Sequence, residues 1–309
     1  MGWVICSTCC APLCYVPLVG RFELRVSEMA YTKRTQLTSG ALHVESSGNP
    51  LGRLVLCVHG LSANCRSFDR FVPVLADAGH HIVTMDLRGR GRSDITQPGS
   101  YGWHSHVRDL LEIAEHYGAD SFDVIGHSMG GFIGMSLAAQ YPRRCRRLVL
   151  IDAAGAPEPG ALLTIAKSVS RLGRTYPSAS AVLSHMRSAG IVAPWDAFWD
   201  SYFAWELEWS NDTVRIRTDL GAVSEDSAYG SKQNVYALWP RLRCPVLLVR
   251  ANRPMARSGG LVVSQADTER FAIEVRDATV VNVDDDHYSI LLSSPAVRAV
   301  ERFLGESNA

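Results

Sequence analysis

The sequence predicts an α/β fold, with a mostly parallel central sheet flanked by helices. Three observations indicate it. Short apolar runs of strand length alternate with segments of helical periodicity along most of the chain. The chain has 309 residues, 47% hydrophobic and 20% charged, so it can bury a large core. The pentapeptide GHSMG at residues 126–130 joins an apolar run directly to a helix-like segment.

The elements follow in order along the chain. The strand-like runs are Ala41–Glu45, Arg53–Val58, His81–Met85, the run ending in Val124 and Ile125, Arg147–Ile151, Pro245–Arg250 and Ala278–Val283. The helix-like segments of the core are Phe68–Ala78, Val107–His116, Ser128–Tyr141 and Ser264–Val275. Strands that alternate with helices in this way form a parallel sheet covered on both faces.

The pentapeptide is typical of a nucleophile elbow. A serine in a tight strand-to-helix turn needs small neighbours, because a Cβ at Gly126 or Gly130 would press on the turn or on the adjacent helix. Ser128 then lies at the positive end of the following helix. We expect Ser128 to be a nucleophile, and we expect the N–H of Met129 to form one half of an oxyanion hole.

The other oxyanion amide is expected after the strand at 53–58. His59, Gly60 and Leu61 follow that strand, and we assign the second amide to Leu61. His59 comes directly after the strand, where a histidine that hydrogen-bonds the loop fits better than a catalytic base.

These motifs resemble the α/β-hydrolase superfamily, and the resemblance extends from about Thr38 to Leu304. The segment DLRGRGRS at 86–93 is similar to the family's loop after the fourth strand. The resemblance implies that Asp86 binds backbone amides there and that this loop is structural. Its arginines indicate a solvated or ion-paired loop rather than an anion site.

The resemblance also implies the order serine, acid, histidine along the chain. His287 fits the base, because it follows the last predicted strand and no other histidine lies beyond His185. The usual acid position after the seventh strand, residues 251–258, has no carboxylate, and Asp267 is too far along. Asp152 ends the sixth strand, and we expect it to be the acid, in the position used by haloalkane dehalogenases and zearalenone lactonases.

The three carboxylates at 284–286 raise the alternative of a metal site. Consecutive residues of an extended turn point in different directions, so a solvated acidic turn is the better interpretation. The sequence predicts no metal and no cofactor.

The chain divides into an N-terminal extension at 1–28, expected to be poorly ordered, a first core segment at 29–155, a helical cap at 156–240 between the sixth and seventh strands, and a second core segment at 241–309. Aromatic residues crowd the cap. They either pack the cap onto the core or line an apolar pocket over the serine, and the substrate-binding candidates are Trp195, Trp199 and Tyr202.

The formal net charge is zero, which argues against a polyanionic partner such as nucleic acid. Residues 2–20 carry four of the eight cysteines and no charge, yet they lack the basic start of a secretory signal, and their prolines disfavour a membrane helix. The other four cysteines are scattered, as free thiols in a reducing cytoplasm would be. A homodimer remains open.

The sequence-based hypothesis is a cofactor-independent serine hydrolase of carboxylic esters, with lactones as a favoured subclass because of the acid placement. The nucleophile would be Ser128, the base His287 and the acid Asp152. Two alternatives remain open. One is another reaction on the same fold, either C–C bond hydrolysis or haloperoxidase-type perhydrolysis. The other is a non-enzymatic ligand receptor on a hydrolase scaffold.

Overall fold

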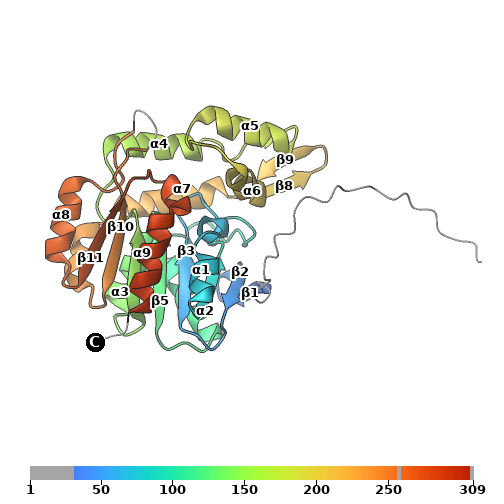
Figure 1. Ribbon diagram of the computed structural model, residues 1–309. Helices are drawn as coiled ribbons and strands as arrows, with labels where there is room; N and C mark the ends of the chain where they lie inside the picture. Colours follow the sequence, from blue (N-terminus) through green and yellow to red (C-terminus); the bar gives the residue numbers. More distant parts are fainter. Residues whose placement is uncertain (1–30, 256–258, 307–309) are drawn as a thin grey trace, which may run out of the picture.

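The computed structural model describes residues 31–255 and 259–306 (Figure 1). Their largest sheet has 8 strands in the order β1-β2-β4-β3-β5-β6-β10-β11. At one edge of the sheet, β2 is antiparallel to both of its neighbours, β1 and β4. The other pairs of strands are parallel. The strands are β1 Tyr31–Leu37, β2 Gly40–Gly48, β3 Leu54–Val58, β4 His81–Met85, β5 Phe122–His127, β6 Cys145–Ile151, β10 Val246–Ala251 and β11 Ala278–Val283.

Helices cover both faces of this sheet, as the alternation predicted. Side chains of a strand point alternately to the two faces, and β3 shows the result. Leu56 packs in one apolar cluster with α2, α3 and α8, whereas Val55 and Cys57 pack in the other with α1 and α9. These helices are α1 Val72–Asp77, α2 Trp103–His116, α3 Met129–Gln140, α8 Gln265–Glu274 and α9 Ser294–Gly305.

Two of the predicted helices begin about one turn away from the expected residue. The helix expected at 68–78 is a 3₁₀ turn, η1 Cys65–Phe68, followed by the short α1, because Pro73 is placed in the first turn of a new helix. The helix expected at 107–116 already begins at Trp103. The edge strand β1 lies before the start of the predicted core strands.

The segment between β6 and β10 lies across one end of the sheet, above the carboxyl ends of the parallel strands (Figure 1). It contains α4 Pro159–Val169, α5 Ala179–Ala189, α6 Ala197–Trp205, α7 Leu220–Gly230 and η2 Val235–Arg241. It also contains an antiparallel sheet of three short strands, β7 Thr175–Tyr176, β9 Thr213–Ile216 and β8 Leu207–Ser210. The expectation of a purely helical cap was therefore incomplete, because strands of two to four residues leave too few positions for an alternating pattern.

The last part of this segment packs with the core. Trp239 of η2 is fully buried against Phe271 of α8, and its indole N–H donates to the carbonyl of Ala154 after β6. Residues 1–28, predicted as an extension, lie outside the described residues. Within 31–255 and 259–306, the helices are all too short or too polar to cross a bilayer. The four cysteines in these ranges are buried free thiols, as expected.

Candidate active site

Ser128 lies in a strained turn between β5 and α3. Its backbone has φ 55° and ψ −123°, a region that non-glycine residues rarely adopt. The turn is closely packed: a Cβ on Gly126 would lie 2.3 Å from the carbonyl oxygen of Gly130, and one on Gly130 would lie 1.9 Å from that of Val58. The glycines at both ends of the pentapeptide are therefore required, and the turn holds the hydroxyl of Ser128 at the carboxyl end of the sheet.

His287 and Asp152 form a buried pair beside this turn. Asp152 follows β6 and His287 lies in the loop after β11, and His287 Nδ1 donates to Asp152 Oδ2 at 2.7 Å. The other carboxylate oxygen accepts the N–H of Ala251 at 3.1 Å. Since Nδ1 carries the donated proton, Nε2 of a neutral His287 is left as a base. Ser128 and His287 line the same cavity.

His127 holds His287 in place, and the sequence analysis gave it no role. Its Nε2 donates to the backbone carbonyl of His287 at 3.0 Å, and the two rings lie 4.6 Å apart between centroids. Burial, with the nearby charge of His287, lowers the pKa of His127 well below its usual range, so this imidazole is neutral. The sequence did contain a signal for such a role, because His127 is a polar residue at the end of an apolar strand and next to the expected nucleophile.

The loop after β3 lies against the nucleophile. A Cβ on Gly60 would lie 3.1 Å from Ser128 Cβ. The N–H of Leu87 donates to His59 Nε2 at 2.9 Å, so the proton of this ring is on Nδ1, which donates to the Gly60 carbonyl at 2.8 Å. That carbonyl and the N–H of Leu61 belong to one planar peptide unit, so His59 fixes the direction of the N–H. His59 has the loop-holding position that the sequence predicted.

The N–H groups of Leu61 and Met129 are the two candidate oxyanion donors. Met129 is the first residue of α3, so its N–H has no acceptor within the helix. Among the backbone hydrogen bonds of the loops and turns in the described ranges, neither group donates. Leu61, Ser128 and Met129 line one cavity, and N–H groups without a backbone acceptor are suited to a negatively charged oxygen.

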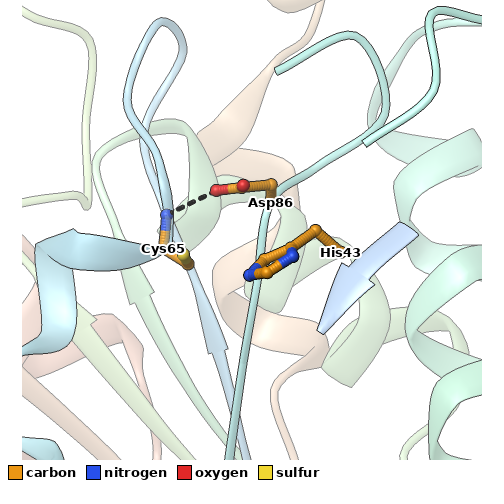
Figure 2. A group of neighbouring side chains, drawn as sticks. All are labelled: His43, Cys65 and Asp86. Carbon is orange, nitrogen blue, oxygen red and sulfur yellow. Dashed lines mark hydrogen bonds between the residues drawn. The ribbon is translucent and has the colours of Figure 1, made fainter. Parts of the chain in front are cut away.

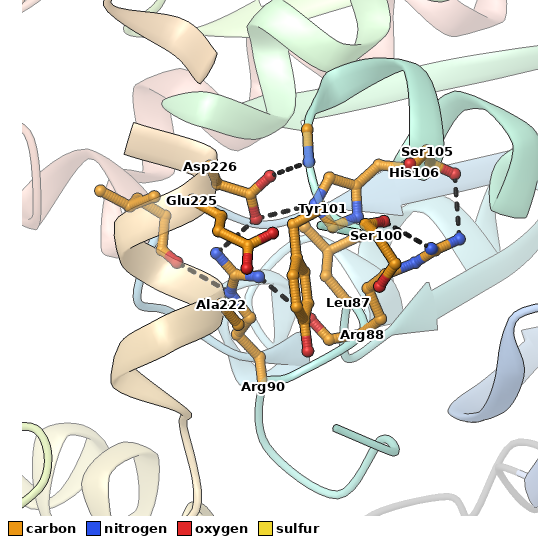
Figure 3. Close-up of polar contacts among 12 residues, drawn as sticks. Leu87, Arg88, Arg90, Ser100, Tyr101, Ser105, His106, Ala222, Glu225 and Asp226 are labelled. Atoms are coloured by element: carbon orange, nitrogen blue, oxygen red, sulfur yellow. Dashed lines mark hydrogen bonds and ion pairs between the residues drawn. The ribbon is translucent and has the colours of Figure 1, made fainter. Parts of the chain in front are cut away.

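The carbonyl of Leu61 is held by Arg90, which also belongs to a buried ion pair with Asp226 (Figure 3). Arg90, which is fully buried, donates from Nε to the Leu61 carbonyl at 3.0 Å and pairs through Nη2 with Asp226 of α7 at 2.7 Å. Asp226 also accepts from His106 Nε2 at 2.9 Å and from the N–H of Gly102 at 2.6 Å. Burial opposes the charge of Asp226, but His106 and Arg90 lower its pKa to about 2.

The fold agrees with the sequence comparisons. A family model for the alpha/beta hydrolase fold matches residues 53–251, well over half of the chain. The chain belongs to the alpha/beta hydrolase family.

Other alpha/beta hydrolases and related proteins match parts of this chain. The human Serine hydrolase-like protein is 32% identical over 114 residues, which are 37% of this chain and 56% of that protein. Lipase 1 of Psychrobacter immobilis is 30% identical over 136 residues, 44% of this chain and 42% of that protein. The chain thus spans about half the length of these curated relatives. The solved structure of E-2-(acetamidomethylene)succinate hydrolase has a TM-score of 0.78 at 23% identity and covers 90% of this chain and 100% of that chain, a likeness of fold.

The three aromatic candidates, one before α6 and two within it, lie in different surroundings in this alpha/beta hydrolase. Tyr202 lines the cavity that contains Ser128 and His287. Trp199 lies behind that lining, fully buried against Tyr202 and Tyr288, and Trp195 stacks on Phe203. The expectation that Trp195 and Trp199 line this cavity is therefore corrected, because a helical stripe shows which side chains are buried but not whether they face a pocket or a neighbour.

The loop at 86–93 has the predicted structural role. Asp86 Oδ1 accepts the N–H of Cys65 at 2.8 Å, and Oδ2 accepts the N–H of Arg92 at 2.9 Å and the indole N–H of Trp205 at 3.0 Å. Arg88 is buried and pairs with Asp109 at 2.7 Å through Nε. Arg88 and Arg90 are thus in buried ion pairs. The sequence analysis expected these arginines to be either solvated or ion-paired.

His43, Cys65 and Asp86 are the one group of three potential metal ligands in the described ranges, with ligand atoms within 4.8 Å of one another (Figure 2). Their chemistry does not fit a cation. Both carboxylate oxygens of Asp86 are already hydrogen-bonded, and burial together with Asp86 raises the pKa of the Cys65 thiol well above its usual range. This group is a hydrogen-bonded support of the loop.

The acidic turn before His287 is structural. Asp286 accepts the N–H groups of Tyr288 and Ser289 at 2.9 Å each, and Asp285 accepts the Ser289 hydroxyl at 3.0 Å. The side chain of Asp284 is 86% exposed. Asp267, in the first turn of α8, accepts from the Tyr236 hydroxyl. In the described ranges, the carboxylate hydrogen-bonded to His287 is that of Asp152.

Proposed function

We propose that this alpha/beta hydrolase cleaves carboxylic esters through an acyl-enzyme on Ser128. One observation carries the proposal: a strained serine shares a cavity with a histidine whose Nδ1 donates to a buried carboxylate at 2.7 Å. The serine hydrolase and lipase names among the relatives support the same class.

In the first half-reaction, His287 Nε2 takes the proton of the Ser128 hydroxyl while Oγ forms a bond to the ester carbonyl carbon. The carbonyl oxygen becomes an oxyanion that the N–H groups of Leu61 and Met129 stabilise. The carbon–alkoxide bond then breaks, and the proton passes from Nε2 to the leaving oxygen. Asp152 keeps the proton of His287 on Nδ1 and stabilises the imidazolium.

In the second half-reaction, water attacks the acyl carbon and gives its proton to Nε2. The bond to Oγ breaks, the acid is released, and the proton returns to Ser128. Apart from the ester and water, the cycle uses groups of this chain alone. The placement of Asp152 after β6 also makes lactones a subclass to be assayed beside open-chain esters.

A fluorophosphonate probe tests the nucleophile directly, because an activated hydroxyl attacks phosphorus and stays bound to it. We expect mass spectrometry to locate the adduct on Ser128, and we expect Ser128→Ala to lose both the adduct and turnover on a panel of methyl esters and lactones. The exposed Ser224→Ala serves as the control. Full turnover by Ser128→Ala would refute the proposal, and specific binding without turnover by the wild type would favour the receptor alternative.

A further inference from the structure

Two cavities of different size meet at Ser128. Ser128, Leu61 and Ile165 line both of them. The first, here the small cavity, has a volume of about 50 Å³ and also contains His287. The second, here the large cavity, has a volume of about 440 Å³ and also contains Met129. An ester at Ser128 therefore has two spaces for its two substituents.

The chemistry distinguishes the two spaces. The leaving alkoxide must take its proton from His287, so the alcohol part has to lie on the side of that imidazole. His287 lines the small cavity and is absent from the lining of the large one. The acyl substituent then has to extend away from His287, past Met129 into the large cavity.

The volumes set what each space can accept. A closed apolar cavity of roughly 150 Å³ holds one benzene ring. The small cavity is about a third of that size, so it excludes a ring and accepts a short alcohol. The large cavity is within the usual range for ligand pockets of roughly 300–1,000 Å³.

The linings agree with this division. The large cavity has apolar walls from the core and from the segment that covers it, among them Trp103, Phe132, Leu162 and Val235. The small cavity also has apolar walls, among them Met186 and Phe203, but these are joined by the polar groups of Ser168, Arg171 and Tyr202. The guanidinium of Arg171 pairs with the buried Glu206 at 3.1 Å, so the small cavity gains no free positive charge from it for an anionic leaving group. A short uncharged alcohol, and afterwards the hydrolytic water, suit this space.

We propose that the preferred substrates are esters of a bulky apolar acid with a short alcohol, such as methyl or ethyl esters, with the acyl group in the large cavity and the alcohol in the small one. This rests on the proposed ester hydrolysis. It adds the substrate class and the direction in which the ester binds.

Two isomeric esters test the direction. Methyl hexanoate and pentyl acetate have the same formula, but the long chain is on the acid in one and on the alcohol in the other. With kcat/KM divided by the rate of hydroxide-catalysed hydrolysis, we expect methyl hexanoate to be preferred by about tenfold or more, because one methylene in a fitted apolar pocket already changes specificity by roughly 10-fold. Equal or reversed preference overturns the assignment, and so does turnover of methyl acetate with neither isomer cleaved. No turnover of any ester would instead refute the proposed function.

Two variants locate the effect. Ala156 is exposed at the rim of the large cavity, and Ala156→Phe should lower the ratio of methyl hexanoate to methyl acetate turnover about tenfold. Ala166→Phe on the exposed side of α4, outside both linings, is the matched control and should leave that ratio unchanged. Ile191→Ala widens the small cavity and should raise pentyl acetate turnover relative to methyl hexanoate. With melting temperatures within a few degrees of wild type, an unchanged ratio in both Ala156→Phe and Ile191→Ala contradicts the assignment.

Discussion

At the scale of single residues, the proposed acid, Asp152, is the feature that most separates this chain from the commoner arrangement. Asp152 has φ 48° and both of its carboxylate oxygens are occupied, one by His287 and one by the N–H of Ala251. We expect Asp152→Asn to lower kcat by roughly 10²- to 10⁴-fold, because the amide no longer fixes the imidazole tautomer or stabilises its cation. Steady-state kinetics on one ester, with circular dichroism to verify folding, measures this.

The control is Asp284→Asn, because that side chain is 86% exposed and lies three residues from His287. Its kcat should stay within a factor of two or so of wild type, as for other surface changes. If Asp152→Asn keeps normal turnover while Asp267→Asn or a variant at 284–286 collapses, another residue is the acid.

His59 connects the site to the pH dependence of stability. Burial is the main cause that lowers the pKa of His59 from 6.5 to about 4. Between these values the unfolded chain binds a proton that the folded chain does not, so stability is complete above about pH 6.5 and decreases as the pH falls toward 4. Over this whole pH range, the shifted pKa of His59 changes the free energy of unfolding by about 3 kcal/mol.

We expect the free energy of unfolding, measured with urea at pH 7, 6 and 5, to fall with pH. In His59→Gln the slope should be smaller but not zero, because His127 titrates in the same direction. A slope equal to that of wild type would mean that His59 is not buried in its neutral form.

At the scale of elements, the Arg90–Asp226 pair joins the loop after β4 to α7 of the covering segment (Figure 3). Removing one partner leaves an uncompensated buried charge, which costs about 3–5 kcal/mol. We expect Asp226→Ala to lower the free energy of unfolding by an amount of that order, and the double variant Arg90→Met with Asp226→Ala to recover part of it. Urea unfolding of the two single variants and the double variant measures the coupling.

The surface pair Arg215–Glu208 provides the comparison, since its side chains are 58% and 30% exposed. Glu208→Gln should change the free energy of unfolding by less than about 1 kcal/mol. Equal losses from Asp226→Ala and Glu208→Gln would show that burial of the pair does not matter.

The elements also show what the sequence could predict. The positions of Ser128, Asp152 and His287 at the ends of their strands were predictable, because the GHSMG turn allows few residue types and the chain order restricts the candidate base and acid. The β7–β9–β8 sheet was not predictable, because its strands are too short for a period, and the placing of Trp195 against Phe203 depends on tertiary packing. The hydrogen bonds of His127 to the carbonyl of His287 and of Arg90 to the carbonyl of Leu61 were not predictable, because a backbone carbonyl that accepts a side chain leaves no mark in the sequence.

At the scale of the whole molecule, the cavity around Ser128 is lined by both core segments, the one before and the one after the covering segment, and by the covering segment itself. Its residues lie between His59 and Tyr288, and the first strand of the described residues begins at Tyr31. We expect deletion of residues 1–28 to leave the melting temperature and ester hydrolysis nearly unchanged. Differential scanning fluorimetry and the methyl ester assay measure both, and a large loss of folded protein would show that this segment belongs to the folded unit.

The hydrogen bond from Ala251 to Asp152 affects which residues of this chain can be exchanged. The strand β10 holds Asp152 through backbone groups: the N–H of Ala251 donates to its carboxylate, and the carbonyl of Val249 accepts its N–H. Any residue supplies the carbonyl, and any residue except proline supplies the N–H. In the commoner arrangement, the loop after this strand must keep a carboxylate. Here no residue of that loop has to be a carboxylate, so the exposed Asn252 and Arg253 can be exchanged without loss of the proposed acid. The buried Met255, Val262 and Val263 still hold the loop against the core.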